Sequence, residues 1–158
     1  IAKGWERAVL KKLCLVASCA VIIAVMTAAP SRAFWGKYSS VAVTEGTVRV
    51  SAADLERGRA HFYKADIGGK DIAFFLVRDM EGNVRAAFDA CDVCFHAKKG
   101  YSEGKNALMI CNQCGMRFPV ARIGFEKGGC NPAPLAMALD GESVIVRADD
   151  LAAGARFF

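Results

Sequence analysis

The chain has 158 residues, of which 54% are hydrophobic and 23% are charged. This length suits one folded domain with an additional segment, and the high hydrophobic content excludes a disordered chain. The formal net charge at pH 7 is +5. A charge of this size points to a nucleic-acid partner only if the basic residues lie in the folded domain.

The positive charge is concentrated in residues 1–40. This segment carries six Lys or Arg residues and one Glu, so its net charge is +5, whereas residues 41–158 carry fifteen bases and fifteen acids. The domain formed by residues 41–158 is therefore neutral, and we expect no nucleic-acid partner. The basic excess instead indicates that residues 1–40 are a targeting or anchoring segment.

An uncharged run rich in Val, Ile, Leu and Ala covers residues 13–29 and ends at Pro30. Its 17 residues are at the short end of the range for a transmembrane helix but exceed the usual core of a signal peptide. Four bases precede the run, so the positive-inside rule places the domain on the extracytoplasmic side of a membrane. The alternative is a signal peptide cleaved near Ala33, because residues 31–33 resemble a small-x-small cleavage site.

Residues 41–158 are predicted to form a mainly β domain with little helix. Residues 72–77 are apolar at every position, which is typical of a central strand buried on both faces. The sequence Ile67-Gly68-Gly69 between two strand-like segments predicts a β-hairpin. About seven strands are expected, at residues 41–50, 59–66, 70–79, 83–90, 106–111, 142–147 and 156–158, with a helix start at 51–56, a loop at 95–105 and a turn or short helix at 149–154.

Two Cys-x-x-Cys motifs are the most specific feature of the chain. Cys91 and Cys94 form the first, Cys111 and Cys114 form the second, and sixteen residues separate them. This spacing is typical of a four-cysteine centre that holds zinc, iron or an iron–sulfur cluster, and thiolates also select copper(I). Disulfides are an alternative in an oxidising compartment. A thiol–disulfide oxidoreductase is a further alternative. The Cys-x-x-Cys motif of such an enzyme usually lies at the start of a helix, and neither motif here clearly does.

Three further residues bear on this centre. His96 follows the first motif and is an additional candidate ligand. Cys130, in the sequence Gly-Gly-Cys-Asn-Pro, is a candidate ligand, a partner for a spare thiol or a free thiol. Gly115 follows the second motif, where a glycine accepts a positive φ and lets backbone N–H groups point at the thiolate sulfurs.

The loops around the cysteines resemble those of a Rieske domain. Cys94-Phe-His96 and the later Cys111-x-x-Cys114-Gly-x-x-Phe are similar to the two loops that hold a two-iron cluster there. Residues 128–134 and 142–146 are similar to the proline loop and the closing strand. Cys114 stands where a Rieske domain has its second histidine. The resemblance implies a small Rieske-like β domain, with a rubredoxin-like or zinc-ribbon-like domain as the alternative.

Four motifs of the domain carry a further resemblance: Arg85-Ala-Ala-Phe-Asp-Ala-Cys-Asp-Val-Cys94, Lys98-Lys-Gly-Tyr101, Cys111-Asn-x-Cys-Gly-Met-x-Phe-Pro119 and Gly128-Gly-Cys-Asn-Pro-Ala-Pro134. Over roughly residues 59–158, the chain resembles a named family, the FtrD-like membrane iron–sulfur proteins. The family implies a bacterial inner-membrane iron–sulfur protein linked to iron uptake, in which electron transfer changes the oxidation state of the transported metal. Its usual companions are a permease and a periplasmic metal-binding protein.

These observations together predict a membrane-tethered electron carrier rather than an enzyme. The expected cofactor is an iron–sulfur cluster, and the expected partner is a membrane permease or a membrane redox protein. The alternatives are a zinc- or copper-binding structural or delivery module and a thiol–disulfide redox protein. The expected ligands are Cys91, Cys94, Cys111 and Cys114, with His96 and Cys130 as additional candidates.

Overall fold

The computed structural model describes residues 36–158, which form one unit. The predicted membrane helix at residues 13–29 and the cleavage site near Ala33 lie outside the described residues. Among residues 36–158, none of the helices has the length and apolar character needed to cross a membrane. The described part is mainly β, as predicted, with ten strands, one short α-helix and four short 3-10 helices.

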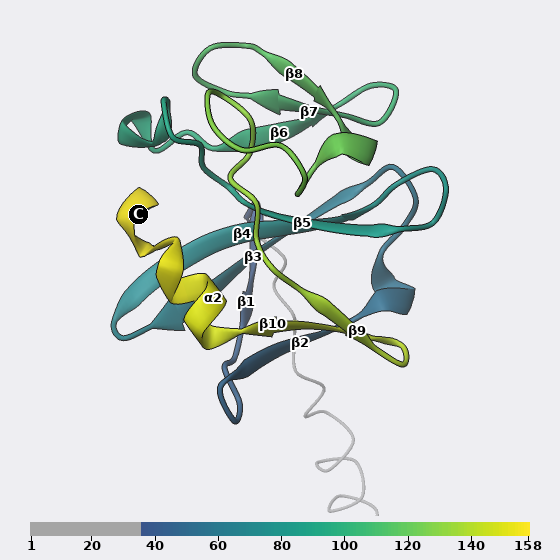
Figure 1. The fold of residues 1–158 in the computed structure, drawn as a ribbon, viewed down its shortest axis with the longest axis vertical. Helices are drawn as coiled ribbons and strands as arrows, with labels where there is room; N and C mark the ends of the chain where they lie inside the picture. The colour runs from purple at the N-terminus through teal and green to yellow at the C-terminus, as the bar shows by residue number, and fades with distance from the viewer. Residues whose placement is uncertain (1–35) are drawn as a thin grey trace, which may run out of the picture. The chain divides into compact units, whose positions relative to one another are not determined.

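A four-stranded sheet forms the middle of the domain, and its strands are ordered β1-β3-β4-β5 (Figure 1). Strands β3, β4 and β5 run antiparallel to one another, and β1 pairs with β3 in parallel. The predicted hairpin is confirmed, because Ile67 pairs with Lys70 across a turn in which both glycines have positive φ. The bounds are β1 Tyr38–Val41, β3 Ala60–Ile67, β4 Lys70–Arg78 and β5 Val84–Phe88.

Strand β4 is buried on both faces, as its apolar sequence predicts. Ile72, Phe74 and Leu76 belong to one core cluster, and Phe75 and Val77 belong to another. All five side chains are fully buried. Because successive side chains of a strand point to opposite faces, β4 lies between two separate apolar layers. The four-stranded sheet therefore supports structure on each side.

The first apolar layer is closed by a second sheet and the C-terminal helix. This sheet is ordered β2-β10-β9, with antiparallel pairing throughout. Alternate valines of β2 and β10 are buried and pack against the four-stranded sheet. The bounds are β2 Thr47–Ser51, β9 Ala138–Asp140, β10 Ser143–Arg147 and α2 Ala148–Ala153.

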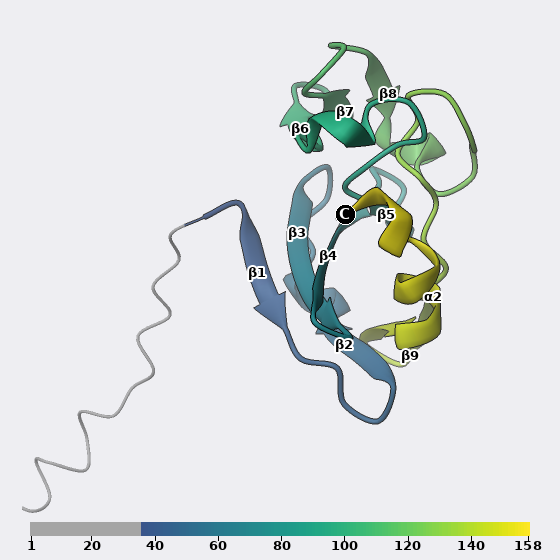
Figure 2. The same cartoon turned by 90° about the vertical axis from the view of Figure 1, so that its left-hand side faces the viewer.

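The second apolar layer is closed by a small antiparallel sheet ordered β6-β7-β8. Tyr101, Met109 and Phe118 of this sheet pack in one cluster with Phe75 of β4. Figures 1 and 2 both show β6, β7 and β8 grouped at one end of the domain, apart from β2, β9 and α2. The bounds are β6 Tyr101–Gly104, β7 Leu108–Cys111 and β8 Arg117–Pro119.

Two strand predictions near the domain ends are wrong. The strand expected at residues 41–50 is broken, because the backbone turns at Glu45 and Gly46, which both have positive φ, and Thr44 and Thr47 bond to each other. The strand expected at residues 156–158 is instead the 3-10 helix Ala155–Phe157. There, the Phe157 ring packs 5.9 Å from the Phe88 ring, which holds the segment against the core without a neighbouring strand.

Two other predictions also need correction. The helix start expected at residues 51–56 is limited to the 3-10 helix Ala52–Asp54, and Ser51 makes no capping bond. Arg78 donates hydrogen bonds to the carbonyls of Ala52 and Leu55, so these carbonyls are satisfied without a longer helix. The loop expected at residues 95–105 contains the 3-10 helix Phe95–Ala97 and strand β6, which pairs with β7.

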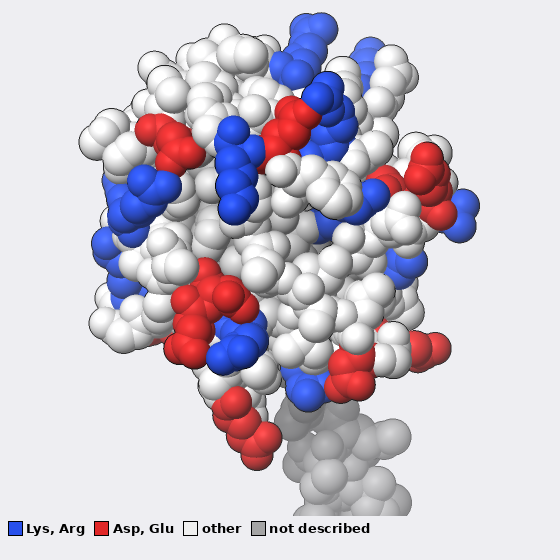
Figure 3. Space-filling model, in the orientation of Figure 1, with Lys and Arg blue, Asp and Glu red and all other residues white. Residues whose placement is uncertain are grey.

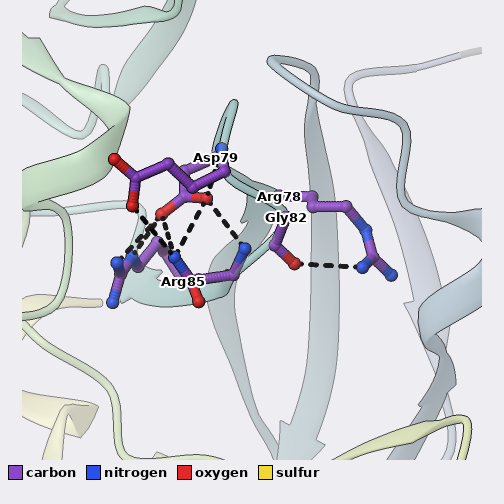
Figure 4. A network of polar contacts seen from close by, with 6 residues as sticks. Arg78, Asp79, Gly82 and Arg85 are labelled. Carbon is purple, nitrogen blue, oxygen red and sulfur yellow. Dashed lines mark hydrogen bonds and ion pairs between the residues drawn. The ribbon is translucent and has the colours of Figure 1, made fainter.

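Charged side chains of both signs are interspersed over the face seen in Figure 3, so neither sign dominates it. Two aspartates, Asp79 and Asp89, are the buried charged residues of the described part of the chain. They flank strand β5, with Asp79 in the turn before it and Asp89 directly after it. Asp79 forms the local network of Figure 4 with Asn83 and Arg85.

Candidate metal centre

The first cysteine loop, residues 91–94, begins three residues after β5 ends. The backbone before it is held on both sides, since Asp89 N–H bonds to the Ala73 carbonyl of β4 and Ala133 N–H bonds to the Ala90 carbonyl. Within the loop, the N–H of Cys94 donates to Cys91 Sγ at 3.2 Å. A buried strand and a hydrogen-bonded backbone thus give the first pair of thiols a rigid support.

The second cysteine loop, residues 111–116, is the turn between β7 and β8. Cys111 is the last residue of β7, and its N–H bonds to the Met116 carbonyl at 2.9 Å. The Gly115 N–H bonds back to the Cys111 carbonyl at 2.8 Å, and Gly115 has a φ of 75°. This positive φ is the one predicted for a cysteine turn, and it is a conformation that glycine adopts without steric cost.

A third segment, the glycine loop at residues 128–132, carries Cys130. Gly128 and Gly129 both have positive φ, 85° and 61°. The Asn131 side chain bonds to the Gly128 carbonyl at 3.2 Å, which closes the turn. The hydroxyl of the buried Tyr101 donates to the Cys130 carbonyl at 2.6 Å and anchors the loop to β6.

These three segments bring five cysteine sulfurs together in two overlapping groups. The Sγ atoms of Cys91, Cys94 and Cys130 lie within 4.8 Å of one another, and so do those of Cys94, Cys111 and Cys114. Cys94 belongs to both groups, and its Sγ lies 3.7 Å from that of Cys130. The four cysteines predicted as ligands therefore lie close together, and Cys130, whose role was open, joins them.

The five thiols differ in exposure. Cys91 and Cys111 are 1% and 2% exposed, whereas Cys94 and Cys130 are partly buried and Cys114 is exposed. Cys91 and Cys111 thus form the buried part of the centre, and Cys114 lies on its exposed side. None of the five is in a disulfide.

The surroundings also shift the pKa values of the thiols in different directions. Burial raises the pKa of Cys94, and the thiols of Cys130 and Cys111 beside it raise it further. Burial likewise raises the pKa of Cys130. The backbone N–H of Met116 is the main cause that lowers the pKa of Cys114, to about 7. Five crowded thiols cannot all ionise without a cation to balance them, so a bound metal is what would stabilise the thiolates.

His96 lies outside both sulfur groups. It is exposed in the 3-10 helix after the first cysteine loop, and its ring stacks against Phe95 with centroids 3.8 Å apart. In the described geometry Cys130 therefore lies beside the four cysteines predicted as ligands, whereas His96 does not.

A cavity of about 350 Å³ lies next to the sulfurs. Aromatic side chains from the 3-10 helices at residues 95–97 and 155–157 form part of its wall. Among its lining residues are Cys91, Cys94, Cys111, Asp89, Tyr101 and Phe157.

Sequence reasoning missed Asp89, which holds the centre to the rest of the domain. Its carboxylate accepts hydrogen bonds from the Tyr101 N–H at 2.7 Å and the Tyr38 hydroxyl at 2.5 Å, and it pairs with the Lys37 ammonium. The backbone of Gly100 lies directly against this carboxylate. The sequence offered one indication of its role, because Asp89 is a single acidic residue between an apolar strand and the first cysteine.

Comparisons with known proteins agree with the resemblance noted in the sequence. No match was found among curated proteins. The profile of the family described as "Membrane iron-sulfur containing protein FtrD-like" matches residues 40–158, about three quarters of the chain. The match includes all five cysteines of the centre and begins close to β1. We conclude that this chain belongs to the FtrD-like family of membrane iron–sulfur proteins.

Proposed function

We propose that this protein is a membrane-tethered carrier of single electrons that holds an iron–sulfur cluster at the cysteine centre. The observation that carries the proposal is the convergence of five thiols from three separate segments in a chain of this family. Thiolates are the donors that iron–sulfur clusters require. The donor set therefore fits the cofactor that the family description implies.

The proposed ligands are Cys91, Cys94, Cys111 and Cys114, two from each cysteine loop. A bound cluster would accept and release one electron at a time. Each loop directs a backbone N–H at a sulfur, from Cys94 to Cys91 and from Met116 to Cys114. Such bonds stabilise negative charge on sulfur and tune the potential of a cluster.

Other residues limit the access of water to the proposed cluster. Tyr101 and Phe118, whose ring centroids are 6.1 Å apart, pack in the same buried cluster as Cys91 and Cys111. The glycine loop at residues 128–132 covers the side of the proposed cluster where Cys130 lies. For β6–β8 and its cysteine turn we propose a rubredoxin-like or zinc-ribbon-like arrangement within the β domain, because β7 ends at one pair of thiols and a hairpin turn presents them.

The cellular setting is also a proposal. Residues 13–29 would anchor the domain to the bacterial inner membrane from the periplasmic side, or a cleavage near Ala33 would release it. The partner would be a membrane permease or a membrane redox protein of an iron uptake system. In this setting the domain exchanges electrons with its partner and does not itself transform a substrate, and it uses no nucleic acid.

Spectroscopy of protein purified without oxygen tests the cofactor. The expected result is visible absorption from sulfur-to-iron charge transfer, an EPR signal in one oxidation state, and equal amounts of iron and acid-labile sulfide. Replacing Cys111, which is buried, by Ser should abolish the absorption, whereas His96→Ser should leave it unchanged. A colourless protein that contains stoichiometric zinc would overturn the proposal.

A zinc- or copper-binding module is the second candidate. It is favoured by the two three-thiol groups, because soft thiolates in small numbers also suit copper(I) and zinc. Elemental analysis of the same preparation separates the candidates, and loss of the fold upon chelation would indicate structural zinc. A thiol–disulfide oxidoreductase has less support. The first motif precedes a 3-10 helix of three residues and the second lies in a hairpin turn, so neither opens an α-helix.

A further inference from the structure

We propose that Cys94 and Cys130 form a disulfide in the metal-free protein, and that this bond closes the centre to metal. The metal-loading part of the inference rests on the proposed metal-binding function. The bond itself is a separate claim, because it concerns two thiols and is tested in the absence of metal.

The two sulfurs are close in space although 36 residues separate them in the chain. Their Sγ atoms lie 3.7 Å apart, and a disulfide requires about 2.05 Å. The remaining gap is small for two loop residues. Cys94 ends a four-residue loop, and Cys130 lies in a loop whose conformation depends on two glycines with positive φ. A side-chain rotation with a small loop shift can therefore form the bond.

Accessibility favours this pair over the pairs within each Cys-x-x-Cys motif. Cys91 is 1% exposed and accepts the N–H of Cys94, and Cys111 is 2% exposed at the end of a paired strand. These two sulfurs are therefore much less accessible to an external oxidant than those of Cys94 and Cys130. Cys94 and Cys130 are both partly exposed. Each is thus reachable, and each has the other as a sulfur neighbour.

The position of Cys94 explains why the disulfide would prevent metal binding. Cys94 is the sulfur common to the two three-thiol groups. Once it is bound to Cys130, the first group retains only Cys91 as a free thiol, and the second retains Cys111 and Cys114. Of the four proposed ligands, Cys91, Cys111 and Cys114 then remain, one fewer than a four-cysteine site needs, and neither group keeps its three thiols. One covalent bond therefore disables both groups together.

The reaction is an exchange with an external disulfide, such as oxidised glutathione or a disulfide-carrying protein. The thiolate of one cysteine attacks the external disulfide, forms a mixed disulfide and expels the first external thiolate. The second cysteine, as its thiolate, then attacks the protein sulfur of the mixed disulfide and expels the second external thiolate. Two electrons pass from the two cysteines to the external disulfide, and two protons leave the cysteine thiols.

Peptide mapping tests the bond. The full chain, purified in detergent and stripped of metal, is equilibrated with oxidised glutathione, alkylated and digested without reduction. Trypsin cleaves after Lys98 and Lys127. A second protease that cleaves before Asp separates Cys91 from Cys94 at Asp92 and also cleaves before Asp140. The expected product is residues 92–98 linked to residues 128–139, which contain Cys130. A link from Cys94 to Cys91, Cys111 or Cys114 would overturn the proposal, as would alkylation of both Cys94 and Cys130.

Cobalt(II) binding, measured by its thiolate absorption, tests the closure of the centre. We expect oxidised wild-type protein to bind Co²⁺ at least tenfold more weakly than reduced protein, with full recovery after phosphine treatment. Cys130→Ser should bind Co²⁺ when reduced and keep most of this binding after the oxidant. Cys114→Ser is the matched control and should still form the Cys94–Cys130 link.

The outcomes distinguish this inference from the proposed function. A zinc protein that contains the link and loses cobalt binding would overturn the iron–sulfur proposal and support the closure. An iron–sulfur protein without the Cys94–Cys130 link would support the iron–sulfur proposal and overturn the closure. If oxidised wild-type protein binds Co²⁺ as tightly as reduced protein, the closure is wrong. If reduced Cys130→Ser is folded by circular dichroism but binds no Co²⁺, Cys130 is a required ligand, and its role as a closing thiol is wrong.

Discussion

A buried aspartate lies on each side of strand β5 along the chain, Asp79 in the turn before it and Asp89 directly after it, and the two are held in different ways. The Asp79 carboxylate accepts hydrogen bonds only from residues within six positions along the chain, namely Glu81, Asn83 and Arg85. Figure 4 shows Asp79 next to Arg85. Asp89 bonds to Tyr101 and, across the four-stranded sheet, to residues about fifty positions earlier, Lys37 and Tyr38. Asp79 thus closes a hairpin, whereas Asp89 joins three distant segments.

This difference separates local stability from assembly of the cysteine centre. The Asp79 network organises the turn from β4 to β5 and contains none of the cysteines. The Asp89 carboxylate lies two residues before Cys91 and bonds to the backbone of Tyr101, whose hydroxyl holds the Cys130 loop. We therefore expect changes at Asp89 to alter the geometry of the thiols, and changes at Asp79 to alter stability alone.

The largest effect is expected for Asp89→Ala. Removing the carboxylate leaves the Lys37 charge and two donors without their acceptor, which should destabilise the fold by about 3–5 kcal/mol. Denaturant unfolding measures this loss, and cobalt titration of the reduced protein should show weaker metal binding. Asp79→Ala is the control and should keep the cobalt affinity. Equal loss of metal binding in both variants would contradict the comparison.

Gly100→Ala tests the close approach to Asp89. An added Cβ would lie 2.5 Å from Asp89 Oδ2, and Gly100 has a φ of 59°. The clash and the strained backbone should together cost about 2–3 kcal/mol. Gly69→Ala is a matched control, since Gly69 also has a positive φ but has no atom within 4 Å of its added Cβ. If thermal unfolding shows the same loss for both, the contact with Asp89 contributes nothing.

Asp79→Asn should cost about 2 kcal/mol at pH 7, because hydrogen bonds to a charged acceptor are lost. Burial acts to raise the pKa of Asp79, but the bonds from Asn83 and Arg85 outweigh it and lower this pKa below 3.8. Because the pKa of Asp79 is lower in the folded than in the unfolded protein, ionised Asp79 stabilises the fold at any pH above the unfolded-state pKa. This stabilisation is lost as the pH falls through the folded-state pKa.

The pH dependence provides the check on this prediction. The difference in unfolding free energy between wild type and Asp79→Asn should be constant from pH 7 to pH 5 and should shrink below about pH 4. Urea unfolding at pH 7, 5 and 3 measures it. A difference that persists unchanged at pH 3 would show that the charge of Asp79 is not what stabilises the turn.

Tyr101→Phe should have the smallest effect on stability, about 1 kcal/mol, because it removes one hydrogen bond to the Cys130 carbonyl. The informative measurement is the alkylation rate of Cys130 in reduced, metal-free protein, which should rise as the glycine loop loosens. Tyr63→Phe removes a hydroxyl from the other core cluster and should leave the rate unchanged. An unaltered rate in Tyr101→Phe would mean that this bond does not hold the loop.

Much of the fold could be predicted from patterns within short segments. The hairpin at Gly68 and Gly69 was predicted because glycine accepts the positive φ that such a turn requires. Strand β4 was predicted to be central because both of its faces are apolar. The break after Val41 was missed, since it depends on non-glycine Glu45 adopting a positive φ. The final segment was missed because packing of Phe157 on Phe88 decides its conformation.

By itself, the sequence determined the identity of the thiols, the turn at Gly115 and the family. These depend on residue types and on bonds within a few positions of the chain. Only the tertiary structure decided that Cys94 lies between two groups, that Cys130 is 3.7 Å from it, and that Asp89 joins the centre to β1. The physical reason is that these contacts form only when the small sheet β6–β8 and the glycine loop pack on the face of β4 and β5. Spacing along the chain does not specify that arrangement.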